Sequence, residues 1–253
     1  MILNYQKTVI RPEFKTIVLI HGLFGSLSNL AMIARHFENS YNIIQIDVRN
    51  HGQSEHHDDI NYQLMAQDVL ETLDAIGIEQ CSLIGHSMGG KIAMAVAAQA
   101  TARIEKLVVL DMSPTVYQQR EHDPFFKALL AVQDAQLQTR PAASEKMREF
   151  IDEEMVIQFL LKSFTPQGWR FNVKALYQHY PEILAWQNLA PNPIPSLFLR
   201  GVNSPYISTE QQIQAIDLQF PNAHIESIPN AGHWLHAEQP KLVLAAIEHF
   251  LNQ

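Results

Sequence analysis

The sequence predicts a doubly wound α/β fold, in which helices cover both faces of a mostly parallel sheet. Short apolar runs recur along the chain with helical stretches between them, an alternation typical of βαβ units. Several runs, such as residues 17–20 and 107–110, are apolar without alternation, as expected of strands that are buried on both faces. The length of 253 residues suits one large domain, or a domain with an insertion.

The expected strands and helices alternate in chain order. Strands are expected over residues 16–20, 42–46, 81–85, 106–110, 196–200 and 224–228. Helices are expected over residues 29–38, 62–76, 88–100, 209–219 and 241–251. Residues 1–10 alternate more between apolar and polar side chains, which favours an antiparallel strand at one edge of the sheet.

This alternation stops between Pro114 and Pro195. Amphipathic helical pieces are expected over residues 125–132, 144–163 and 172–180, and no strand is expected among them. A segment of about eighty residues is too long for a plain loop in a compact domain. We therefore interpret it as a helical insertion, after which the sheet resumes.

Composition and charge exclude several classes of protein. Hydrophobic residues make up 47% of the chain and charged residues 17%, as in ordinary globular proteins. The formal net charge is −8, and the sequence has no basic stripe that could neutralise the phosphates of a nucleic acid. No apolar stretch reaches the ~20 residues of a membrane span, the first residues lack the pattern of a signal peptide, and the one cysteine, Cys81, cannot form an internal disulfide. We therefore expect a cytoplasmic, reduced protein without a nucleic-acid or membrane partner.

The most informative motif is residues 85–89, Gly-His-Ser-Met-Gly, which follow an apolar run and open an Ala-rich helical stretch. This pattern is typical of a nucleophile elbow, in which Ser87 lies on a sharp turn between a strand and a helix. Glycine is expected at positions 85 and 89 because backbone crowds the turn and a Cβ would clash. The sequence therefore predicts that Ser87 is a nucleophile.

A serine hydroxyl needs a base within hydrogen-bond reach, and that base needs an acid that fixes its tautomer. His233 fits the role of the base, because it follows the last strand and precedes the final helix. His236 is the rival, but it would begin to follow the helix away from the sheet edge. A surface histidine without a catalytic role is the plain alternative for His233.

Two backbone amides are expected to stabilise the oxyanion. One is the amide of Met88, directly after the nucleophile, and the other comes from the loop after an earlier strand. Residues 20–26 end such a strand, and we assign the second donor to Leu23, with Phe24 as its neighbour. His21 is expected to brace this loop through hydrogen bonds rather than to react.

Over essentially its full length the chain resembles the α/β-hydrolase superfamily. The resemblance is carried by residues 21–22 (His-Gly), 47–54, 85–90 and 232–233. Residues 21–26, 111–114 and 200–204 together resemble the YbfF-type bacterial esterases. The resemblance implies an α/β-hydrolase fold with a core at residues 1–113 and 195–253 and a helical cap at residues 114–194. It also implies a serine esterase, with acyl-CoA thioesters as further candidate substrates.

The chain departs from the superfamily in the position of the acid. Most members carry it after the strand that follows the cap, where residues 200–205 offer no carboxylate here. Asp111 closes the preceding strand at the same sheet edge, so we expect it to orient His233. A turn-capping role ahead of Ser113 is the alternative, and Asp217 is disfavoured because it lies inside an expected helix.

Other polar motifs receive structural interpretations. Residues 47–54 are expected to form a scaffold in which Arg49 pairs and Gly52 allows a tight turn, with Asp68 as a further member. The run His56, His57, Asp58 and Asp59 is read as a solvated loop rather than a metal site, and no cofactor motif is present. Some aromatic residues of the insertion, with Phe24, Tyr206 and Trp234 from the loops, are expected to line an apolar acyl pocket.

These observations predict a carboxylic-ester hydrolase that needs no cofactor and works as a monomer or homodimer on a small ester or thioester. Ser87, His233 and Asp111 are the expected catalytic residues, with the amides of Leu23 and Met88 as oxyanion donors. Because a fold does not determine a reaction, two alternatives remain. One is a lyase that uses the same residues, and the other is a ligand sensor with slow turnover.

Overall fold

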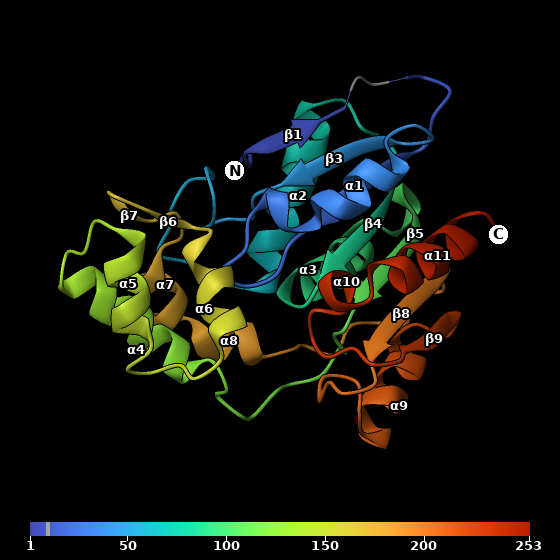
Figure 1. Ribbon diagram of the computed structural model, residues 1–253. Helices are drawn as coiled ribbons and strands as arrows, with labels where there is room; N and C mark the ends of the chain where they lie inside the picture. Colours follow the sequence, from blue (N-terminus) through green and yellow to red (C-terminus); the bar gives the residue numbers. More distant parts are fainter. Residues whose placement is uncertain (9–10) are drawn as a thin grey trace.

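The computed structural model describes residues 1–8 and 11–253. A seven-stranded sheet forms its centre (Figure 1). The strands are β1 (Tyr5–Lys7), β2 (Thr16–Ile20), β3 (Asn42–Ile46), β4 (Cys81–His86), β5 (Ile104–Leu110), β8 (Ser196–Gly201) and β9 (Ala223–Ile228). They lie in the order β1-β3-β2-β4-β5-β8-β9, and every neighbouring pair is parallel except β1 with β3. The predicted architecture is confirmed, with β1 as the antiparallel edge; residues 9 and 10 of that predicted edge lie outside the described residues.

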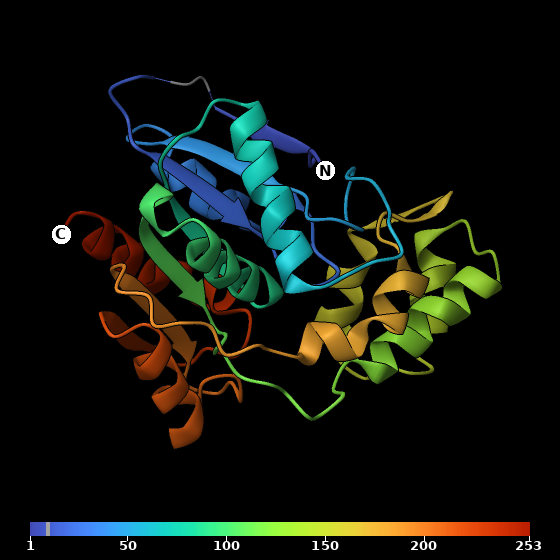
Figure 2. The same ribbon diagram turned by 180° about the vertical axis from the view of Figure 1, so that it is seen from behind.

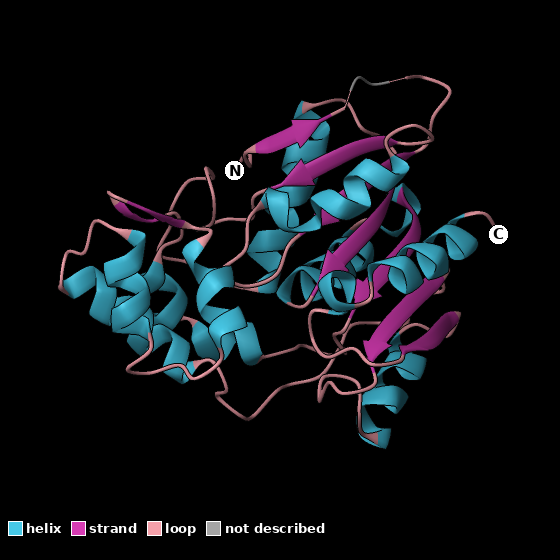
Figure 3. Cartoon of the chain, viewed as in Figure 1, coloured by secondary structure: helices cyan, strands magenta, loops and turns pink. Residues whose placement is uncertain are grey.

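Helices alternate with these strands (Figure 3). They are α1 (Ala31–Phe37), α2 (Tyr62–Ala75), α3 (Met88–Gln99), α9 (Glu210–Gln219), α10 (Leu235–Glu238) and α11 (Pro240–Leu251), with short 3-10 turns at Leu27–Leu30 and Thr101–Arg103. The four-residue helix α10 is one that the sequence pattern does not predict. In the part of the chain that the structure describes, no helix has the length and apolarity that crossing a membrane requires.

Strand β2 illustrates why the sheet is buried on both faces. Successive side chains point to opposite faces, so Ile17 and Leu19 join the apolar cluster under α1 and α11, whereas Val18 and Ile20 join the cluster under α2 and α3. Figure 1 shows the first pair of helices in front of the sheet, and Figure 2 shows the second pair from behind. Burial on both faces explains the continuous apolar run.

The segment between β5 and β8 lies to one side of the sheet, on the side toward which the parallel strands point (Figure 1). We call residues 114–194 the insert. It contains α4 (Asp123–Asp134), α5 (Arg140–Met147), α6 (Glu154–Leu161), α7 (Val173–Gln178), α8 (Tyr180–Leu184) and a hairpin of β6 (Phe164–Thr165) and β7 (Gly168–Trp169). Its buried side chains continue the apolar cluster that lies under α2 and α3.

Two expectations for the insert are wrong. Residues 144–163 do not form one helix, because the chain leaves helical structure between α5 and α6. The acidic residues Asp152, Glu153 and Glu154 stand where α6 begins, and negative charge is favourable at a helix N-terminus. The insert also contains strands, but each has only two residues, which is too short for alternation to show.

Candidate active site

The turn between β4 and α3 has the geometry of a nucleophile elbow. Ser87 has φ 56° and ψ −123°, a conformation that residues other than glycine rarely adopt. A Cβ added to Gly85 would lie 2.2 Å from the carbonyl oxygen of Gly89, and one added to Gly89 would lie 2.2 Å from that of Ile20. The two glycines therefore allow strand and helix to approach closely enough for the turn. The amide of Ser87 donates to the carbonyl of Leu110 on the neighbouring strand at 3.0 Å.

Three side chains from distant parts of the sequence meet at this turn. Ser87 Oγ lies 2.9 Å from His233 Nε2, and His233 Nδ1 lies 2.7 Å from Asp111 Oδ2. Asp111 is fully buried, and its carboxylate also accepts the amide of Gly201 at 3.0 Å and the hydroxyl of Ser204. Since a carboxylate can only accept, Nδ1 of His233 carries the proton and Nε2 is free to accept from Ser87.

Ser204 is a residue that sequence reasoning missed. It follows β8, the position where the superfamily usually has its acid, and it donates a hydroxyl to Asp111 instead. Asp217 lies in α9 and is exposed. A signal for Ser204 was available, since the loop that lacks a carboxylate still reaches the same sheet edge.

Further histidines surround His233. Nε2 of His86 donates to the carbonyl oxygen of His233 at 2.9 Å, and this bond connects the loop that carries His233 to the turn between β4 and α3. Burial, followed by the proximity of His236 and His233, holds the pKa of His86 well below its usual value. His236 packs edge-on against His86 with ring centroids 4.5 Å apart, and its buried Nδ1 has no hydrogen-bond partner in the described residues. Of the two rival histidines, it is His233 that contacts Ser87.

The loop after β2 lies directly against the nucleophile. A Cβ added to Gly22 would lie 3.1 Å from Ser87 Cβ. Within the described residues, the amides of Leu23 and Met88 have no hydrogen-bond acceptor. Both predicted oxyanion donors are therefore available to a ligand beside Ser87.

The same loop is held by two histidines. His21 Nδ1 donates to the carbonyl of Gly22 at 2.8 Å, which is the bracing expected for this residue. The amide of Gly25 reaches the same oxygen at 3.1 Å. The amide of Phe24 donates to His51 Nε2 at 3.1 Å, so Phe24, unlike Leu23, has no free amide to offer.

A pocket of about 530 Å³ opens at Ser87. The side chains that line it come from the loop after β2, the His233 loop and helices α4 and α6 of the insert, and they include Phe24, His122, Phe125, Met155, Phe159, Leu160, Lys162 and Trp234. Phe159 packs against Trp234 with ring centroids 5.9 Å apart, so the insert and the histidine loop form one wall. Phe24 and Trp234, two of the residues expected to line an acyl pocket, are among the residues that line this pocket.

Tyr206, which was also expected to line the acyl pocket, is not among the residues that line this pocket. Its ring stacks on the ring of His233 at 4.1 Å, and it borders a separate pocket of about 640 Å³. Its carbonyl also accepts the hydroxyl of Tyr117 at 2.7 Å. Tyr206 therefore contacts the imidazole of His233 from outside the 530 Å³ pocket.

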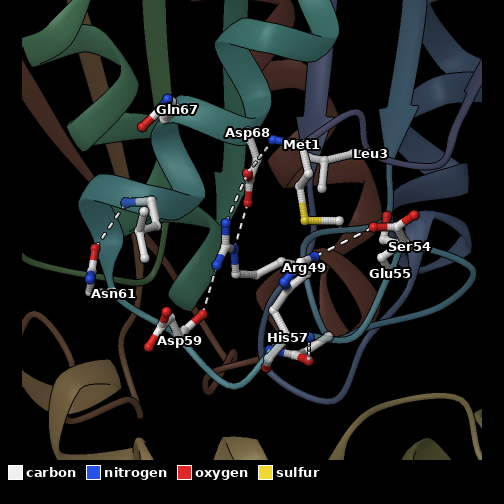
Figure 4. A network of polar contacts seen from close by, with 12 residues as sticks. Met1, Leu3, Arg49, Ser54, Glu55, His57, Asp59, Asn61, Gln67 and Asp68 are labelled. Carbon is white, nitrogen blue, oxygen red and sulfur yellow. Dashed lines mark hydrogen bonds and ion pairs between the residues drawn. The ribbon is translucent and has the colours of Figure 1, made fainter.

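The scaffold expected at residues 47–54 is present (Figure 4). Arg49 forms a two-pronged pair with Asp68, at 2.6 and 2.9 Å, and Asp68 also contacts the amino group of Met1 at 3.0 Å. Gly52 has φ +61°, and a Cβ there would lie 2.1 Å from the carboxyl carbon of Asp47. These contacts fix the loop that carries His51.

The acidic and histidine-rich run that follows is exposed. His57 contacts Glu55 at 3.4 Å, and the neighbouring His56 is exposed as well. Among residues 1–8 and 11–253, no three histidine, cysteine or acidic side chains are grouped so that they could hold a metal ion.

Comparisons of the sequence with known proteins agree on one family. Residues 15–240 match the family described as alpha/beta hydrolase fold. The chain is 51% identical to Esterase YbfF of Escherichia coli (strain K12), over 93% of this chain and 92% of that protein. It is 37% identical to the sn-1-specific diacylglycerol lipase ABHD11 of Mus musculus, over 93% of this chain and 80% of that protein.

A solved structure described as a marine microorganism esterase superposes with a TM-score of 0.93, at 32% identity and with 98% of this chain and 99% of that chain covered. The fold, the family match and the near-complete coverage agree. The chain therefore belongs to the α/β-hydrolase family and is a hydrolytic enzyme.

Proposed function

We propose that this enzyme is a serine carboxylesterase that hydrolyses small to medium acyl esters through an acyl-enzyme. The observation that carries the proposal is the hydrogen-bonded series from Ser87 through His233 to Asp111, at 2.9 and 2.7 Å, beside two amides that have no acceptor among the described residues. Relatives named as esterases over more than nine tenths of the chain support hydrolysis of an ester.

In the proposed mechanism, Ser87 Oγ attacks the ester carbonyl while His233 Nε2 takes its proton. The tetrahedral oxyanion is bound by the amides of Leu23 and Met88. The imidazolium then gives the proton to the departing alcohol, and an acyl-enzyme remains. Water attacks the acyl group in the same way, with His233 first accepting and then returning a proton, and the free acid leaves.

Asp111 has two tasks in this mechanism. Its carboxylate keeps the proton of His233 on Nδ1 and stabilises the imidazolium that forms during the reaction. Donation from Gly201 and Ser204 holds the carboxylate in place, since it fixes both oxygens. A buried and fully hydrogen-bonded carboxylate needs no rearrangement when the charge on His233 appears.

We propose that the insert acts as a cap that sets the size of the acyl group. Support comes from the apolar residues of α6, Met155, Phe159 and Leu160, which line the pocket at Ser87. Lys162 also lines it, and the lysine ion pairs of the described residues are those of Lys15 and Lys146, not of Lys162. A free cation there suits a substrate with an anionic leaving group, so acyl-CoA thioesters are a second candidate substrate.

We propose that the reaction takes place in the cytoplasm, where thiols stay reduced, because the single cysteine, Cys81, is free and buried. We also propose that the enzyme is a monomer or a homodimer.

The test is kcat/KM across p-nitrophenyl esters of increasing chain length and matched acyl-CoA thioesters, with Ser87→Ala as the control. We expect activity that disappears in Ser87→Ala, by about 10⁶-fold in kcat as for other serine hydrolases, together with a maximum at one acyl length. Background rates in both proteins would reject the esterase and favour a lyase with the same residues, or a ligand sensor that is stabilised by a ligand without turnover.

A further inference from the structure

Phe24 adopts a backbone conformation that a phenylalanine rarely takes. Its φ is +63°, in the left-handed region that favours glycine. Three contacts hold it there: its amide donates to His51 Nε2 at 3.1 Å, its carbonyl accepts the hydroxyl of Ser163 at 3.3 Å, and its buried ring packs against Phe126 at 5.0 Å. Such a residue persists only when its surroundings hold it from several sides.

His51 connects this residue to the neighbouring loop. Because the amide of Phe24 donates to Nε2, that nitrogen carries no proton, and the Nδ1 proton is donated to the carbonyl of Arg49 at 2.9 Å. Burial, with the nearby His21 as a further cause, lowers the pKa of His51 to about 3. The ring is therefore neutral at ordinary pH and bridges two backbone segments.

His21 forms the reciprocal bridge. It starts on the Phe24 loop, accepts the amide of Val48 on Nε2 at 3.2 Å and donates to the carbonyl of Gly22 at 2.8 Å. The rings of His21 and His51 lie edge to face, with centroids 5.2 Å apart. Each loop thus supplies one histidine that accepts an amide of the other loop.

The two bridges fix both peptide units that flank Leu23. A peptide unit is planar and trans, so its carbonyl and its N–H point in opposite directions. The unit before Leu23 is held through the Gly22 carbonyl, and the unit after it is held through the Phe24 amide on His51. The N–H of Leu23 has no acceptor in the part of the chain that the structure describes, and it lies beside Ser87.

We infer that His51 is a positioning residue of the oxyanion hole: by binding the Phe24 amide, it fixes the peptide unit after Leu23 and, together with His21 on the unit before it, keeps the N–H of Leu23 directed at the substrate oxygen. The inference rests on the proposed function, because it requires Leu23 to be an oxyanion donor. The insert supports the same bridge from outside, since Ser163 binds Phe24 and the amide of Asn172 donates to the carbonyl of Asn50 at 2.9 Å.

Two polar substitutions separate the two hydrogen bonds of His51. In His51→Gln the side-chain oxygen can reach the position of Nε2 and accept from Phe24, whereas in His51→Asn the shorter amide reaches only the Arg49 side. His56→Asn, on the exposed part of the same loop, is the matched control. Thermal unfolding of each protein shows that it is folded before its kinetics are measured.

We expect His51→Asn to lower kcat for a p-nitrophenyl ester by about 10- to 100-fold, somewhat less than the loss of a whole oxyanion donor. KM should stay within about twofold, because the interaction strengthens only in the transition state. His51→Gln should recover most of the loss, and His56→Asn should leave kcat unchanged. Binding of a trifluoromethyl ketone, which forms a tetrahedral adduct with a serine, should weaken in parallel with kcat/KM.

Equal kinetics for His51→Asn and His51→Gln would overturn the inference, as would a change confined to KM or to the melting temperature. Activity that persists in Ser87→Ala is a separate result. It would remove the proposed function, and the role of His51 with it. Loss of activity in Ser87→Ala together with a native kcat in His51→Asn would reject the positioning role alone.

Discussion

The loops at the edge of the sheet and the insert both line the pocket at Ser87, but different forces hold them. At the sheet edge, Ser87 and Asp111 lie on strained backbone, with φ of 56° and 55°, and main-chain hydrogen bonds fix them. In the insert, aromatic side chains pack on one another, as where Trp169 stacks on Phe171 at 5.5 Å. In the proposed function, the backbone of the core therefore determines the chemistry, whereas side chains of the insert select the substrate.

The largest expected effect concerns the core. In Asp111→Asn one carboxylate oxygen becomes an NH₂ group, which cannot accept from His233, Ser204 or Gly201. The imidazole loses its preferred tautomer, and we expect kcat to fall by about 10⁴-fold. Steady-state kinetics on a p-nitrophenyl ester measure the change. A loss below about 10-fold would show that Asp111 is not the acid of the proposed mechanism.

Packing of the insert gives the next largest effect. Phe126 is completely buried, and its ring lies 5.0 Å from Phe24 and 5.1 Å from Tyr180. Phe126→Ala should lower the free energy of unfolding by about 3–5 kcal/mol, because it leaves a cavity. Urea unfolding measures it, and Met155→Ala is the exposed control on α6. A single cooperative transition is expected because the two apolar regions are continuous; separate transitions would contradict that continuity.

Acid should destabilise both regions through buried neutral histidines. Burial is the main cause that lowers the pKa of His51 to about 3 and those of His122 and His236 to about 4. Below the unfolded pKa of about 6.5, the unfolded chain binds protons that the folded chain does not. The contribution of these histidines to the free energy of unfolding should therefore be constant above about pH 6.5 and fall by up to about 1.4 kcal/mol per pH unit for each histidine toward pH 4.

Urea unfolding at pH 7.5 and pH 5 tests this dependence. His122 belongs to the insert, and its Nδ1 forms a hydrogen bond with the hydroxyl of Tyr180 at 2.7 Å. His122→Asn removes one titrating group and keeps a polar atom near that hydroxyl. We expect a shallower loss of stability in acid for this variant, and an unchanged slope would exclude His122 as a contributor.

The smallest effect concerns selectivity. Phe159 of α6 lines the pocket and packs against Trp234. Phe159→Ala should enlarge the pocket, so that the preferred acyl chain becomes longer and kcat/KM for the shortest esters falls by about fivefold, near the value of one apolar contact. The ratio of kcat/KM between long and short esters measures the shift. The wild-type ratio in the variant would show that α6 does not limit the acyl chain.

Most of the core could be predicted from local pattern. The predicted bounds of β2 and β3 agree with the structure residue by residue, because an apolar run between turns determines a buried strand. The insert was predicted less well. The division of residues 144–163 into α5 and α6, and the two-residue strands β6 and β7, depend on packing rather than on period.

The site divides in the same way. The elbow motif placed Ser87 on its turn, and chain order brought His233 and Asp111 to one sheet edge, because parallel strands end on the same side. The sequence by itself determines that these residues share a sheet edge, but not the contacts among them. Only the tertiary structure decided that Ser204 donates to Asp111, that Tyr206 stacks on His233 outside the 530 Å³ pocket, and that His51 holds Phe24. These contacts join residues from different loops, and a local sequence pattern does not determine which side chains of distant loops meet.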